Sequence, residues 1–69
     1  MDTKELFEKI TGLTLKQVKD FYDEEYGHYK YEVDSSSLLI VLDKVLKFNI
    51  ESGRIIKPQI ENNKIYVYL

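Results

Sequence analysis

Apolar residues near the start of the chain recur at the spacing of an amphipathic helix. Leu6 and Ile10 lie four positions apart, and residues at this spacing share one helical face. Asp2 is a favoured N-cap residue. Gly12 is a typical helix stop because glycine adopts positive φ without a steric penalty. The pattern predicts a helix over about residues 2–11.

A second helix start follows directly. Thr14 and Gln17 form a Thr-x-x-Gln capping box, in which each side chain bonds the backbone N–H of the other residue. Gly27 provides the next stop signal. The apolar residues between these signals share one helical face: Leu15, Val18, Phe21 and Tyr22. The sequence therefore predicts a second helix over about residues 15–26, which forms a helical hairpin with the first.

The periodicity changes after Gly27. Apolar and polar residues alternate over 29–33 and again over 46–50, as they do in strands with one buried face. Residues 51–53, Glu-Ser-Gly, fit a three-residue hairpin loop with glycine at the positive-φ position. We expect this loop to lead into a short strand near 54–57.

Two signals shape the C-terminal part of the expected sheet. Pro58 has no N–H to donate to a sheet ladder, so a bulge or an edge segment is expected there. Asn62-Asn63 suits a two-residue type I′ turn, because asparagine tolerates positive φ. This turn would place Ile60 opposite Ile65.

Residues 36–48 fit two structures. Their apolar positions match one face of a third helix that Ser35 or Ser36 could cap. Two strands joined at Asp43-Lys44 are preferred, because a neighbouring strand accounts for the apolar run and for the alternation that follows. The predicted fold class is α+β: an N-terminal helical hairpin packed on a small antiparallel β-meander of four to five strands over 28–69. At 69 residues the chain is expected to form a single domain, 1–69.

Composition argues against catalysis. The chain has no Cys and one His, His28, and it has no Gly-rich phosphate loop. Its acids lack the spacing of a calcium-binding loop, so we expect no enzyme activity, no cofactor and no metal site. The longest apolar run, residues 38–42, is far short of a membrane span. Because small secreted domains usually need disulfides, a cytoplasmic protein without membrane contact is expected.

A helix-turn-helix resemblance covers 23 of the 69 residues. Residues 5–27, ELFEKITGLTLKQVKDFYDEEYG, are similar to the start of MerR-type regulators, with TGLT as the turn. Gly12 matches the turn glycine, and three residues match the apolar, cap and core positions of the motif: Leu13, Thr14 and Val18. The resemblance implies a small DNA-binding regulator whose reading helix presents Lys16, Gln17 and Lys19.

The sequence departs from this motif in charge and in size. Glu8 stands where the motif normally has a small residue, and the reading helix becomes acidic after Lys19. Phosphate binding requires positive potential, so the DNA-binding regulator is the alternative function and nucleic acid is not the preferred partner.

The charge distribution indicates a protein partner. Residues 20–34 carry six acids against one lysine, together with four tyrosines. Acids steer basic partners, and tyrosine gives a large contact area at low entropic cost. The expected function is non-enzymatic binding of a basic protein, in the manner of a phage-type inhibitor of a nucleic-acid-handling host protein. A free sheet edge could also pair two copies as a homodimer. The expected partner-binding residues are Asp20, Asp23, Glu24, Glu25, Tyr26, Tyr29, Tyr31 and Glu32.

Overall fold

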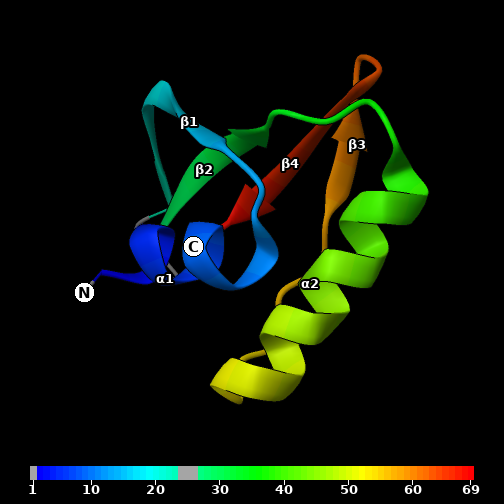
Figure 1. The fold of residues 1–69 in the computed structure, drawn as a ribbon. Helices are drawn as coiled ribbons and strands as arrows, with labels where there is room; N and C mark the ends of the chain where they lie inside the picture. The colour runs from blue at the N-terminus through cyan, green and yellow to red at the C-terminus, as the bar shows by residue number, and fades with distance from the viewer. Residues whose placement is uncertain (1, 24–26) are drawn as a thin grey trace.

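The computed structural model describes residues 2–23 and 27–69, with the backbone alone for Asp20, Phe21 and Asp23. Its elements are α1 (Thr3–Thr11), β1 (Leu15–Asp23), β2 (His28–Val33), α2 (Leu38–Ser52), β3 (Gln59–Glu61) and β4 (Lys64–Tyr68). The strands form one antiparallel sheet in the order β1-β2-β4-β3 (Figure 1). The α+β class is thus confirmed, but the helices alternate with strands and do not form an N-terminal hairpin.

Helix α1 forms where local signals predict it. The Asp2 side chain accepts the backbone N–H of Glu5 at 2.8 Å, so a donor in the first turn is satisfied. Gly12 ends the helix in the left-handed conformation, with φ at 73°. Its N–H bonds the carbonyl of Glu8 at 2.9 Å, which closes the last turn.

The segment predicted as the second helix is strand β1, so that prediction was wrong. Leu15 pairs with Val33 of β2, and the strands continue to a pairing of Asp23 with His28. The Glu8 carboxylate accepts the N–H of Leu15 at 2.8 Å and fixes the connection from α1 into the strand. With a strand at 15–23, the expected helical hairpin and its helix-turn-helix motif are not formed. The predicted end of that helix, residues 24–26, lies outside the described residues.

Strands β3 and β4 form the predicted C-terminal hairpin. Asn62 and Asn63 both have positive φ, 50° and 63°, as a type I′ turn requires. Ile60 pairs with Ile65, which confirms the expected register. The strand expected near 54–57 was wrong, because β3 begins only after Pro58.

Helix α2 replaces the strand pair that we preferred for residues 36–48. Ser37 caps it by accepting the N–H of Ile40 at 3.4 Å, and Gly53 ends it with φ at 74°. The third-helix alternative is therefore correct, although the cap is one residue later than expected. The strand expected over 46–50 and the hairpin loop at 51–53 are also wrong, because both segments belong to this helix or its end.

Both helices cover one face of the sheet. The Phe7 ring of α1 packs against the Phe48 ring of α2, with centroids 5.0 Å apart. Alternate residues of the sheet point into the same core, where burial of apolar surface stabilises the two layers. The buried apolar residues are Phe7, Leu15, Tyr31, Val33, Val41, Val45, Phe48, Ile65 and Val67.

Candidate protein-binding surface

Helix α2 carries a row of exposed apolar side chains on the side away from the core. Positions 39, 42, 46 and 50 are spaced by three, four and four residues. At about 100° per residue they fall within an arc of roughly 80° on the helix surface. We call these four residues, together with the adjacent Ile40, the α2 outer stripe: Leu39, Ile40, Leu42, Leu46 and Ile50. Their exposed fractions range from 45% to 81%.

The opposite side of the same helix is already occupied by the core. Val41, Val45 and Phe48 are at most 2% exposed and pack with α1 and the sheet. A surface helix of a globular domain normally has one apolar face and one polar face. Helix α2 has apolar residues on both, so its outer stripe has no role in the monomer's core.

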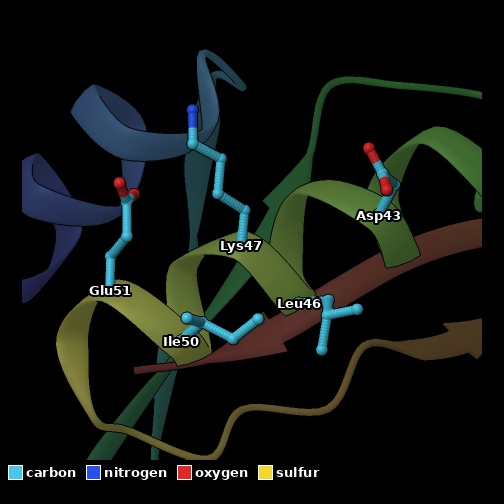
Figure 2. A pocket seen from close by; sticks show the side chains of 5 residues that line it. All are labelled: Asp43, Leu46, Lys47, Ile50 and Glu51. Carbon is cyan, nitrogen blue, oxygen red and sulfur yellow. The ribbon is translucent and has the colours of Figure 1, made fainter.

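A shallow hollow runs beside the stripe. Figure 2 shows Leu46 and Ile50 on one side of it and the charged side chains of Asp43, Lys47 and Glu51 on the other. Its volume is about 330 Å³. The charged rim combines two acids with one base, so it presents no field of a single sign.

The other side of α2 is bordered by the segment that leads into β3. Asn49 bonds the backbone of Ile56 through both polar atoms of its side-chain amide, which holds this segment along the helix. Strand β3 lies beside α2 at the edge of the sheet (Figure 1). Ile60 of β3, which pairs with the buried Ile65 of β4, is also exposed.

The structure describes only part of the predicted acidic, tyrosine-rich surface. The backbones of Asp20 and Asp23 lie in β1, and their side chains are outside the description. Glu24, Glu25 and Tyr26 lie outside the described residues. The residues that are described occupy three different environments.

Tyr29 is the predicted contact residue with the most accessible side chain among those described. It is exposed and pairs across the strands with Tyr22, which is also exposed; their ring centroids are 4.6 Å apart. Tyr31 is only 7% exposed and belongs to the core, where burial raises the pKa of its phenol. Glu32 forms an ion pair with Lys64 at 3.5 Å. The predicted set is thus divided between core and surface. Glu32 points to the opposite face of β2 from Tyr31, because successive residues of a strand alternate. Tyr29 shares the face of Tyr31 but is exposed near the end of the strand.

The face of the sheet opposite the helices holds a cluster of polar and aromatic side chains around Lys30. Lys30 Nζ lies 2.8 Å from a carboxylate oxygen of Glu61 and 4.4 Å from the centre of the Tyr66 ring. The hydrogen bond with Glu61 raises the pKa of Lys30, against the opposing effect of partial burial. Cation–π and ion-pair contacts of this kind link β2, β3 and β4. The cluster therefore contributes to the cohesion of the sheet.

Two other features are absent from the described part of the chain: a cluster of metal ligands and a membrane-crossing helix. Over residues 2–23 and 27–69, no three His, Asp or Glu side chains come together as metal ligands. Neither α1 nor α2 has the length and apolar character of a membrane-crossing helix. Comparison of the chain with family models, curated proteins and solved structures finds no match.

The α2 outer stripe escaped the sequence reasoning for an identifiable reason. Its positions belong to the run that we preferred to divide into two strands. In a helix, positions 41, 45 and 48 form one apolar stripe and positions 39, 42, 46 and 50 form another. The presence of two apolar stripes in one run was the signal that could have indicated an exposed apolar surface. The two stripes become separate surfaces only when the segment is helical.

Proposed function

We propose that this protein functions by stoichiometric binding of another polypeptide, which docks on the α2 outer stripe. The observation that supports the proposal is the row of large apolar side chains, 45% to 81% exposed, on a helix whose other face forms the core. Contiguous apolar surface of this kind marks interaction sites in globular proteins.

The energy available from the stripe is adequate for docking. Complete burial of one Leu or Ile side chain contributes about 1.5–3 kcal/mol. Five partly exposed side chains, with matching apolar surface on the partner, offset much of an association cost of about 4–15 kcal/mol. A partner that buries only one end of the stripe would not do so.

The charges beside the stripe favour a polypeptide partner. Asp43 and Glu51 flank Lys47 along the helix. A helix that binds anionic membranes carries an excess of Lys and Arg on its polar face, and nucleic-acid binding requires positive potential. Mixed charges around an apolar strip are instead typical of helix-to-helix contacts.

A capture experiment with matched variants tests this function. The double variant Leu46→Glu/Ile50→Glu places two charges in the stripe without touching the core. Ile55→Glu is the control, because Ile55 is 86% exposed and lies beyond the last residue of α2. We expect bound polypeptide, at a fixed molar ratio, with the wild type and the control and its loss with the double variant. Equal capture by all three proteins would contradict the proposal.

The acidic, tyrosine-rich surface is a second candidate, for a basic protein partner. The exposed ring pair of Tyr22 and Tyr29 supports it, since exposed tyrosines are frequent in interfaces. The double variant Tyr22→Ser/Tyr29→Ser tests this surface in the same capture experiment. Loss of a basic partner with this variant, and its retention with Leu46→Glu/Ile50→Glu, would assign binding to the hairpin of β1 and β2.

A further inference from the structure

We propose that the polypeptide that docks on the α2 outer stripe is a second copy of this chain, and that the two α2 helices pack antiparallel across a two-fold axis. This inference rests on the proposed function and names its partner. In a two-fold pair the same patch serves both subunits, so the patch must complement itself. The apolar residues of the stripe and the charged residues beside it both meet this requirement.

The apolar residues of the stripe match one another when the helix is reversed. A two-fold axis level with Val45 places Leu39 of one copy near Ile50 of the other, and Leu42 near Leu46 of the other. At about 1.5 Å per residue, each pair is level to within roughly 3 Å along the helix axis. Both ends of the stripe are therefore covered at once.

The charged rim distinguishes the antiparallel arrangement from the parallel one. The same axis brings Asp43 of one copy opposite Lys47 of the other, and this pairing occurs twice by symmetry. A parallel two-fold pair would instead place the Asp43–Lys47 flanks of the two copies on opposite sides of the interface, so neither charge would face its oppositely charged counterpart. Flanking charges of this kind set the orientation of packed helices, and here they select the antiparallel pair.

The hollow beside the stripe gives the second copy a place to insert. It lies between the apolar residues Leu46 and Ile50 and the charged rim, so side chains of the opposing helix can enter between the two rows. Packed helices fit ridges of one into grooves of the other. A standard interface takes about 800 Å² from each partner, which is roughly one-sixth of the 5024 Å² accessible surface of this chain.

The first test measures the molar mass of the purified chain across concentrations from about 1 µM to about 500 µM, by light scattering and sedimentation. We expect the mass to rise toward twice 8.2 kDa. Leu46→Glu/Ile50→Glu should raise the dissociation constant at least about 30-fold, as loss of central interface residues does. Ile55→Glu should leave it unchanged. Circular dichroism of each variant shows whether it is folded.

The second test uses the charge pair. Asp43→Lys and Lys47→Asp should each weaken self-association by about 3- to 30-fold, because each creates two like-charge contacts at the rim. An equimolar mixture of the two variants should regain the wild-type affinity by forming a mixed dimer, in which every rim contact again joins opposite charges. Neither variant removes an apolar contact, so recovery in the mixture reports the facing of Asp43 and Lys47 across the axis.

The outcomes separate this inference from the function on which it rests. A monomer at every concentration overturns the second-copy inference; the proposed function still stands if capture of another polypeptide depends on Leu46 and Ile50. A dimer that Leu46→Glu/Ile50→Glu leaves intact overturns it as well, since the contact then lies elsewhere, such as at a sheet edge. A dimer that this variant dissociates, without recovery in the charge mixture, overturns the antiparallel arrangement. Binding of the monomer to anionic vesicles through the stripe would overturn both proposals.

Discussion

The side-chain amide of Asn49 forms two hydrogen bonds with the backbone of Ile56. Its Nδ2 donates to the Ile56 carbonyl oxygen at 2.9 Å, and its Oδ1 accepts the Ile56 N–H at 3.0 Å. The segment after α2 is thereby held against the helix before it enters β3. This pairing also helps to fix the rotation of α2, and with it the side chains that face outward.

Replacement of Asn49 should therefore destabilise the domain. Asn49→Ala leaves both polar groups of Ile56 without their partner, which costs about 1–3 kcal/mol for partly buried groups. For a domain of this size the melting temperature should fall by about 4–8 °C per kcal/mol. Gln59→Ala, at an exposed amide of the edge strand, is the control. An Asn49→Ala protein as stable as this control would show that the two hydrogen bonds contribute little.

The contact between the two helices should be the most sensitive part of the core. Phe48 is fully buried against Phe7, and truncation of a buried phenylalanine costs about 3–5 kcal/mol. The total stability of a domain this small is only about 3–10 kcal/mol. Phe48→Ala should thus be largely unfolded or close to it by circular dichroism, whereas Ile55→Ala, which truncates an exposed side chain, should unfold as the wild type does.

The turn between β3 and β4 offers a paired prediction with opposite signs. Asn63 has a φ of 63°, a conformation that costs a residue with a Cβ roughly 1–2 kcal/mol and is worst for branched side chains. Asn63→Val should therefore lower the denaturant midpoint, and Asn63→Gly should raise or preserve it. A midpoint that ranks valine above glycine would contradict the type I′ geometry.

The paired Lys30 and the buried Tyr31 should make the domain less stable in alkaline solution. Hydrogen bonding to Glu61 raises the pKa of Lys30 above its ordinary 10.5, and burial raises the pKa of Tyr31 above its ordinary 10.0. A raised folded-state pKa gives stability that is fully present below the unfolded value and is lost as the pH rises through the folded value. Both groups act in the same direction, so stability should decline as the pH rises above about 10.

Thermal unfolding from about pH 8 to pH 11 checks this prediction. Tyr31→Phe removes the contribution of the phenol, and Glu61→Gln removes the carboxylate that stabilises the charged form of Lys30. Each variant should show a shallower alkaline decline than the wild type. If both variants decline as steeply as the wild type, other groups dominate the alkaline response.

Local signals were sufficient where neighbouring residues satisfy one another. Helix α1 begins after Asp2 and ends at Gly12 as expected, because a side-chain cap and a glycine stop act within one turn of the helix. Asn62-Asn63 likewise fixed the register of Ile60 with Ile65, since the turn type alone determines which residues pair. These features require no information from distant parts of the chain.

Local signals failed where a segment fits two structures equally well. Thr14 and Gln17 have the residues of a capping box, yet the Thr14 carbonyl accepts the N–H of Asp34 at 2.9 Å and begins a sheet contact. Pairing along β2 buries Leu15 beside Val33, and this long-range gain outweighs a helix propensity worth only tenths of a kcal/mol per residue. The sequence of 15–23 does not contain its partner strand, so it could not reveal the outcome.

The α2 outer stripe shows most clearly the difference between what the sequence determines and what the tertiary structure decides. The sequence alone determined that residues 38–50 are rich in apolar side chains, that Asp43 and Lys47 interrupt them, and that Asn62-Asn63 joins two strands. Only the tertiary structure decided that 38–52 is a helix and that Val41, Val45 and Phe48 face the core. Because one helix can bury only one side against a single sheet layer, the remaining apolar residues were left at the surface.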